Sequence, residues 1–206
     1  MIKGSYTIQP IGYRAAMDLI VEKHYLHRRA PCSFAFVLIN TDGIICGVIT
    51  YGTPSSSSLR EGIFGKEFSN EVIELTRLWV DDTVPKNGES FLIGNTLRKV
   101  DKKIIVSYAE LEQGHIGTVY QATNFIYTGL SAKRTNWTVS GINKHCQTLA
   151  DKYTASEIRE KFGSRFSLVD RPRKHRYIFL NCRKSERKNI LSKLKYDISP
   201  YPKAAK

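Results

Sequence analysis

The order of apolar and polar residues along the chain predicts alternating strands and helices. Residues 5–9 alternate as a short strand, and residues 11–23 carry apolar side chains at the spacing of an amphipathic helix. Two apolar runs at 33–39 and 44–51 flank an Asp-Gly turn, which predicts a hairpin. The polar run GTPSSSS at 52–58 predicts a mobile loop after that hairpin.

The middle of the chain continues with a long strand, a loop and a helix. The run EVIELTRLWV at 71–80 indicates a strand, residues 81–87 a loop, and residues 88–99 a helix whose first amides could cradle an anion. Glu74 and Arg77 lie three positions apart and would point to opposite faces of a regular strand. We expect at least one of them to face a site, and an internal ion pair is the structural alternative.

The stretch 104–129 gathers polar residues at the junctions of its elements. A β-branched run at 104–106 predicts a buried strand, SYAE at 107–110 follows its carboxyl end, and GHIG at 114–117 opens a helix. Ligands bind beyond the carboxyl ends of strands in open sheets, and two glycines around a histidine allow close backbone approach. We therefore expect this stretch to form the centre of a site.

The last third of the chain contains further strands and two helices. Residues 125–130 and 177–180 predict strands, separated by a polar excursion at 132–146 and by a short helix at 154–163 that opens with a capping box. Residues 184–195 predict a basic helix with apolar residues on one face. The residues after this helix are expected to fray.

Positive charge is concentrated in the second half of the chain. Residues 1–100 carry 11 Lys and Arg against 10 Asp and Glu, whereas residues 101–206 carry 21 against 9. This asymmetry favours a polyanionic partner, most simply nucleic acid, and a basic surface kept for solubility is the alternative. With 206 residues, the chain suits one domain, with a core at 1–150 and a basic part at 151–206 that completes the sheet and contacts the nucleic acid.

Composition excludes several classes of protein. No apolar run reaches eighteen residues and the first residues lack an apolar leader, so we expect no membrane partner and a cytoplasmic location. The four cysteines are scattered without a Cys-x-x-Cys pair, which indicates neither a zinc framework nor a disulfide scaffold.

The order of elements resembles the GNAT acyltransferase fold. This resemblance implies an α/β (α+β) protein with a mixed, mostly antiparallel central sheet flanked by helices. The GNAT family holds the pyrophosphate of acyl-CoA on a Gly-rich loop after its fourth strand. This chain has VDDTVPKNGES at that place, with Gly88 as its only glycine, so ordinary use of acetyl-CoA is not expected.

A closer resemblance covers about residues 10–130. The segments EKHYLHR, GVITYG, EVIELTRLWVDDTVPKNGESFLIG and SYAELEQGHIGTVYQATNFIYTG look like those of the Mom proteins of Mu-like phages. Glu110 departs from the Asp expected in the family's SYAD segment. The resemblance implies a GNAT-related enzyme that converts adenine N6 in phage DNA to N6-(carbamoylmethyl)adenine and so blocks host restriction. The enzyme would act on double-stranded DNA in the cytoplasm of the bacterial host.

Candidate site residues follow from this resemblance and from the residue types. His24 could act as acid or base near neutrality, and Arg77 offers a fork for a phosphate or carboxylate, while a capping histidine and an ion-paired arginine are the structural alternatives. Catalytic roles are expected for His24, Tyr25, Glu74, Tyr108, Glu110, His115 and Tyr120, and donor-binding roles for Arg77, Asn87, Gly88, Ser90 and Asn124. The candidates for DNA contact are Arg28, Lys133, Arg134, Trp137, Arg171, Arg173, Lys174 and Arg176, with a core role as the alternative for Trp137.

The product that the resemblance implies constrains the donor. Attack of the adenine amine on a thioester would give an N6-acetyl amide, whereas the expected product has a CH2 bonded to that nitrogen and a terminal carboxamide. One route oxidises a group derived from acetyl-CoA, for which His24, Glu110 and His115 could hold iron. The other route transfers glycine from a donor such as glycyl-tRNA and rearranges through a five-membered ring. A conventional N-acetyltransferase and a non-catalytic DNA-binding protein are the alternative functions.

Overall fold

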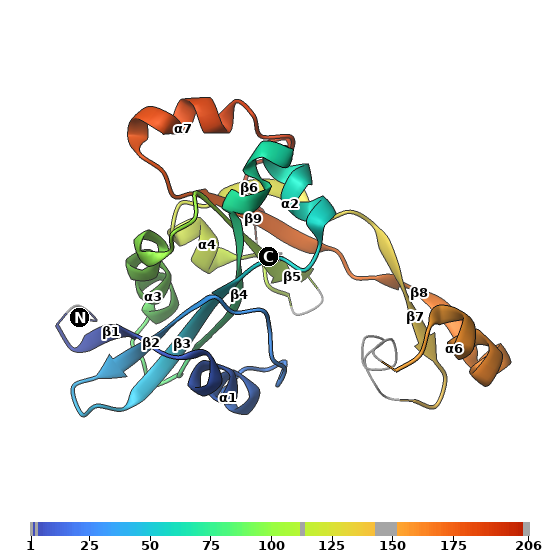
Figure 1. Cartoon of the computed structure of the whole chain (residues 1–206). Helices are drawn as coiled ribbons and strands as arrows, with labels where there is room; N and C mark the ends of the chain where they lie inside the picture. Colours follow the sequence, from blue (N-terminus) through green and yellow to red (C-terminus); the bar gives the residue numbers. More distant parts are fainter. Residues whose placement is uncertain (1, 3, 112–113, 143–151, 204–206) are drawn as a thin grey trace.

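A computed structural model describes residues 2, 4–111, 114–142 and 152–203 (Figure 1). The strands of this part are β1 (Tyr6–Pro10), β2 (Phe34–Asn40), β3 (Ile45–Gly52), β4 (Val72–Val80), β5 (Ile104–Glu110), β6 (Ile126–Leu130), β7 (Arg134–Val139), β8 (Phe166–Arg171) and β9 (Lys174–Leu180). Its α-helices are α1 (Tyr13–Lys23), α2 (Ser57–Phe64), α3 (Gly88–Thr96), α4 (Thr118–Ala122), α6 (Ala155–Phe162) and α7 (Lys184–Leu191).

A seven-stranded sheet organises the described residues, in the order β1-β2-β3-β4-β5-β9-β6. Neighbouring strands are antiparallel except β4 and β5, which are parallel. The mixed, mostly antiparallel sheet expected from the sequence is therefore confirmed. No helix among the described residues has the length and apolar character that crossing a membrane requires.

Helices cover both faces of this sheet. On one face, α3 and α4 pack in a cluster that includes Ile105. On the other face, α2 and α7 pack in a cluster that includes Ile104 and Val106, and α1 packs in a third cluster with Val48. The alternation of neighbouring residues between clusters is what the period of a strand requires. Glu74 and Tyr108 share this second face with Val106, whereas Tyr120 of α4 comes from the first.

The parallel strands β4 and β5 separate after three residue pairs. The last pair is Glu74 with Val106, after which β4 stays paired with β3 up to Val80 and β5 stays paired with β9 up to Glu110. Polar residues that we expected to follow β5 are therefore part of this strand. The carboxyl-terminal halves of β4 and β5 border an opening in the sheet, at the position expected for a ligand.

A β-bulge in β4 places Glu74 and Arg77 on the same face. Two consecutive residues of β3 pair with Arg77 and Leu75, so Thr76 is the extra residue. Leu75 and Leu78 accordingly pack in the same cluster although they are three positions apart. The expectation that Glu74 and Arg77 point to opposite faces assumed a regular strand and is wrong.

The serine-rich run after β3 opens a helix instead of remaining a loop. α2 begins at Ser57, and the Oγ of Ser56 accepts the amide of Leu59 (3.2 Å) as an N-cap. A serine hydroxyl replaces the missing intrahelical partner of such an amide, so serines before an apolar run can signal a helix as well as a loop.

β7, β8 and α6 form an arm that projects from the rest of the chain (Figure 1). The two strands pair with each other in a separate sheet, so part of the polar excursion expected at 132–146 is a strand. The predicted capping box is present: the amide of Glu157 donates to Thr154 Oγ1, and the amide of Thr154 donates to the Glu157 carboxylate. We call residues 132–173 the arm, of which 143–151 lie outside the described part.

The end of the chain packs back onto the sheet. β9 lies between β5 and β6, so residues from both halves of the chain form one sheet. Beyond α7, the amide of Ser199 donates to the carbonyl of Tyr127 (3.0 Å), and the hydroxyl of Tyr201 donates to the carbonyl of Phe125 (2.7 Å). The expectation that these residues fray is therefore wrong for the part up to residue 203.

Candidate functional site

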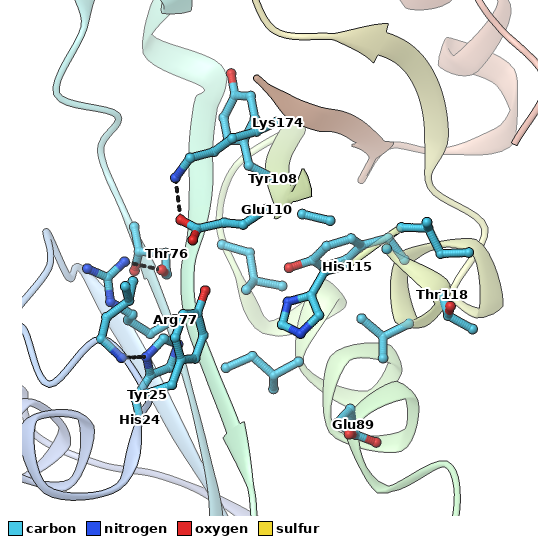
Figure 2. A pocket seen from close by; sticks show the side chains of 18 of the residues that line it. His24, Tyr25, Thr76, Arg77, Glu89, Tyr108, Glu110, His115, Thr118 and Lys174 are labelled. Carbon is cyan, nitrogen blue, oxygen red and sulfur yellow. Dashed lines mark hydrogen bonds and ion pairs between the residues drawn. The ribbon is translucent and has the colours of Figure 1, made fainter. Parts of the chain in front are cut away.

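A cavity of about 550 Å³ lies in the opening between β4 and β5 (Figure 2). Its walls come from the end of α1, the separated halves of β4 and β5, the loop before α4, and β9. We call it the cleft cavity. Nine of the predicted site residues line it: His24, Tyr25, Glu74, Arg77, Tyr108, Glu110, His115, Tyr120 and Lys174.

His24 follows the last residue of α1 and is only 5% exposed. Its Nδ1 accepts the amide of Leu26 (3.1 Å), which leaves the proton of the neutral ring on Nε2. Burial, reinforced by the positive charge of Arg77, lowers the pKa of His24 to about 4. The expectation that His24 titrates near neutrality is therefore wrong. At neutral pH it is an uncharged hydrogen-bond donor.

The ring of Tyr25 contacts both His24 and His115. Tyr25 stacks on His24 with ring centroids 4.4 Å apart and meets His115 edge to face at 6.1 Å. Burial and the negative charge of Glu110 raise the pKa of Tyr25, so its hydroxyl stays protonated at neutral pH. The cavity thus offers flat ring surfaces beside hydrogen-bonding groups, an arrangement that suits a planar heterocycle.

Two carboxylates face the same side of the sheet from β4 and β5. Glu110 forms an ion pair with Lys174 of β9 (2.5 Å). Burial raises the pKa of Glu74, against the opposing effect of the positive charges of Lys174 and Arg77. Glu74 is therefore more basic than an ordinary carboxylate, which suits a role as base, whereas the ion pair with Lys174 orients Glu110 as a hydrogen-bond acceptor.

Backbone carbonyls hold Arg77 in place. Its Nη1 donates to the carbonyl of Thr76 (2.7 Å), and its Nε donates to the carbonyl of Arg28 (3.4 Å). The ion pair with Glu74 that we considered as a structural alternative is not among those of the described residues. Arg77 lines the cleft cavity, and in Figure 2 its guanidinium lies beside Thr76, where its remaining N–H groups can donate to an anionic or carbonyl oxygen.

The loop before α4 depends on a glycine next to an aromatic ring. Gly117 has a φ of 76°, and a Cβ at this position would collide with the ring of Tyr177, whose hydroxyl donates to the carbonyl of Ile116. This close approach fixes the loop that carries His115. Tyr120 of α4 is buried behind it, and burial raises its pKa to about 12.

The residues predicted to bind the donor at the start of α3 do not line the cleft cavity. Asn87 takes a left-handed conformation with φ 78°, and the hydroxyl of Ser90 donates to its carbonyl (3.0 Å). Gly88 is buried against Val84. Glu89, which we did not predict, is the residue of this turn that lines the cavity. The hydroxyl of Ser90 and the amide of Gly88, which donates to the carbonyl of Pro85, serve the turn itself, and donor binding at this helix start stays a prediction.

The structure also differs from two further expectations, which concern Asn124 and an iron site. Asn124 also lies outside the lining of the cleft cavity, and its left-handed φ of 62° lets it end α4, with its amide donating to Gln121. The expected iron site of His24, Glu110 and His115 is not formed either. No three His, Cys, Asp or Glu side chains of the described residues are grouped to hold a metal ion. The residues therefore do not fit iron.

The residues predicted to contact DNA differ in exposure and in contacts. Lys133, Arg134 and Arg171 are exposed on the arm. Arg173 instead donates to the carbonyls of Ser131 (2.6 Å) and Leu130 (3.3 Å) and so holds the base of the arm. The others are placed as follows: Lys174 lines the cleft cavity, Arg176 is buried, Arg28 is exposed near Arg77, and the side chain of Trp137 lies outside the described part.

Known proteins resemble this chain in sequence and in fold. A sequence model of the Mom protein family matches residues 5–203. "Methylcarbamoylase mom" of Escherichia phage Mu is 26% identical over 204 residues, which cover 95% of this chain and 83% of that protein. The solved structure of a spermidine N-acetyltransferase from Vibrio cholerae matches with a TM-score of 0.50 at 10% identity, covering 91% of this chain and 98% of that one. This likeness shows the fold alone, and it confirms the predicted GNAT-like architecture.

Proposed function

Because the chain belongs to the Mom protein family, we propose that it is a transferase that modifies adenine in phage DNA. The product is N6-(carbamoylmethyl)adenine, and its formation protects the DNA against restriction in the cytoplasm of the bacterial host. The name of the phage Mu relative supports this reaction. The observation that carries the proposal is the convergence of His24, Arg77, Glu110 and His115 on one cavity.

The cleft cavity offers groups that match the edge of an adenine. Adenine presents a ring-nitrogen acceptor beside its exocyclic amine donor. The Nε2–H of neutral His24 donates to the ring nitrogen, and the carboxylate of Glu110 accepts from the amine. The pKa of Glu74 is raised by burial, so Glu74 is a stronger base than an ordinary glutamate, and it takes the proton that the amine loses.

The base must leave the duplex to reach this cavity. Adenine N6 is paired inside double-stranded DNA, so the enzyme extrudes the nucleotide or captures it when it opens. Lys133, Arg134 and Arg171 of the exposed arm contact the DNA backbone. These contacts hold the duplex while Tyr25 and His115 provide ring surfaces for the extruded base.

The donor is an activated acyl group whose carbonyl oxygen lies at Arg77. A glycyl ester such as glycyl-tRNA balances the reaction without an oxidant. N6 attacks the glycyl carbonyl and releases the alcohol of the donor, giving an amide. The free amine then attacks C6 to close a five-membered ring, and cleavage of the original C6–N6 bond leaves a CH2 on the new nitrogen and a terminal carboxamide.

A glycine-labelling experiment tests this function. The protein is coexpressed with a plasmid in cells fed isotope-labelled glycine, and the masses of the plasmid nucleosides are measured by mass spectrometry. We expect a deoxyadenosine heavier by a carbamoylmethyl group that contains the label. The same product without label would assign the donor to an acetyl-derived group. No modified deoxyadenosine would contradict the proposed function.

The fold supports a second candidate function. A GNAT-like fold also suits transfer of an acetyl group from acetyl-CoA to a small amine or protein. Release of coenzyme A on incubation with acetyl-CoA and a polyamine, together with unmodified plasmid DNA, would favour that function. Unmodified DNA without any turnover would favour a DNA-binding protein that lacks catalytic activity.

A further inference from the structure

A second cavity of about 320 Å³ lies at the base of the arm. Glu74, Tyr108 and Lys174 line both this cavity and the cleft cavity, so the two share a wall. The remaining walls come from the start of α2, the base of the arm and Tyr196. We call it the arm-side cavity. Its position allows one extended ligand to occupy both cavities.

Arg176 places a buried positive charge in the wall of the arm-side cavity. It is 7% exposed, and its guanidinium donates to the side chain (2.9 Å) and the carbonyl (2.8 Å) of Thr128 while stacking over the ring of Tyr196. All of these partners are uncharged, and Arg176 takes part in none of the ion pairs of the described residues. A buried guanidinium without a counter-ion is destabilising, so an anion in the cavity would be strongly favoured.

Two more cations face each other at the same place. Arg134 of β7 and Arg171 of β8 are directly opposite partners in the two-stranded sheet, and both line the arm-side cavity. Like charges in such a pair repel each other. An anion between them would remove this repulsion. Glu74 is the acidic residue of the lining, and it is shared with the cleft cavity.

The start of α2 adds to the positive character of the cavity. Ser56 and Ser58 line it, and their hydroxyls are hydrogen-bonded to each other (2.8 Å). The amino-terminal end of a helix carries a partial positive charge. Hydroxyl groups, a helix start and three arginines together match an oxyanion with several acceptor oxygens, such as a phosphate.

We propose that the arm-side cavity binds a backbone phosphate of the DNA strand next to the nucleotide whose base enters the cleft cavity. This inference rests on the proposed function. The shared wall places the phosphate beside the extruded base, and Arg134 and Arg171 continue into the exposed cations of the arm. The DNA strand therefore enters along the arm, and its phosphate is held where the arm joins the sheet. This contact positions the adenine before reaction.

Neutral phosphate analogues test this site. The probe is a DNA duplex with one unpaired adenine, in which single phosphates around that adenine are replaced by methylphosphonates. Binding is measured over a range of salt concentrations for the wild-type protein and for R134Q/R171Q. The control is R14Q/R98Q, which removes the same charge from exposed arginines outside this cavity.

In the wild-type protein, a methylphosphonate beside the unpaired adenine should weaken binding about tenfold. R134Q/R171Q should bind the unmodified duplex more weakly, lower the salt slope by about 2, and no longer respond to that methylphosphonate. R14Q/R98Q should retain the response. Equal sensitivity at all phosphates, or a retained response in R134Q/R171Q, would overturn the inference.

A parallel measurement identifies the source of the phosphate. If the cavity binds the phosphates of the donor, R134Q/R171Q should lose affinity for glycyl-tRNA or for acetyl-CoA and keep its response to the methylphosphonate, which would also overturn the inference. The masses of the nucleosides from plasmid coexpressed with the wild-type protein are measured by mass spectrometry. Unmodified adenine together with the expected phosphate response would contradict the proposed function and leave the DNA site standing.

Discussion

The neutral state of His24 makes the stability of the protein depend on pH in a defined way. Its pKa is about 4 in the folded protein, against 6.5 for an unperturbed histidine. Below about pH 6.5 the unfolded chain binds a proton that the folded protein excludes, so stability falls as the pH drops from there toward 4. Between about pH 8 and pH 5 this single group should cost about 2 kcal/mol of unfolding free energy.

Denaturant unfolding of wild-type protein and His24→Asn isolates this contribution. The Asn oxygen can still accept the amide of Leu26 but cannot be protonated in this range, so the variant should lose about 2 kcal/mol less than the wild type over the same pH interval. His27→Asn is the matched control, since His27 is exposed and has a φ of 44° that Asn tolerates. Parallel pH profiles for the wild type and His24→Asn would refute a buried, neutral His24.

Three further substitutions test the cleft. Arg77→Lys should lower adenine modification of coexpressed plasmid by at least about tenfold with little change in Tm, because an ammonium cannot replace the two parallel N–H donors of the guanidinium. Unchanged modification would exclude donor binding by Arg77. Glu110→Gln should abolish modification and cost about 1 kcal/mol through its half-buried ion pair, measured by denaturant midpoint; full activity would remove the carboxylate from the reaction. Gly117→Ala should lower stability by more than about 2 kcal/mol, and clearly more than Gly114→Ala, which is strained but meets no atom.

Much of the fold could be predicted because its strands are buried on one or both faces. The apolar runs at β2, β3 and β4 and the Asp-Gly turn indicated the hairpin and the long strand at nearly their observed positions. β8 could not be found in this way, since most of its side chains are exposed and no apolar pattern marks it. α2 was missed because serines signal both loops and helix caps.

The sequence allowed us to predict which segments meet at the cleft cavity, but not the details that local geometry decides. Residues around His24, Glu110 and His115 do line one cavity. The bulge at Thr76 depends on the register in which β4 pairs with β3, and the sequence of β4 alone does not reveal this register. Ser90 was expected to bind an anion, but its hydroxyl donates to the adjacent turn, an outcome that competes with ligand binding at many helix starts.

A crystal structure with a DNA duplex that contains one unpaired adenine would test the central claim most directly. The account predicts the adenine ring inside the cleft cavity, with its N6 within hydrogen-bond distance of Glu110 and a ring nitrogen within that distance of His24 Nε2. An adenine that remains stacked in the duplex, or that binds elsewhere while the cleft cavity stays without a base, would contradict it.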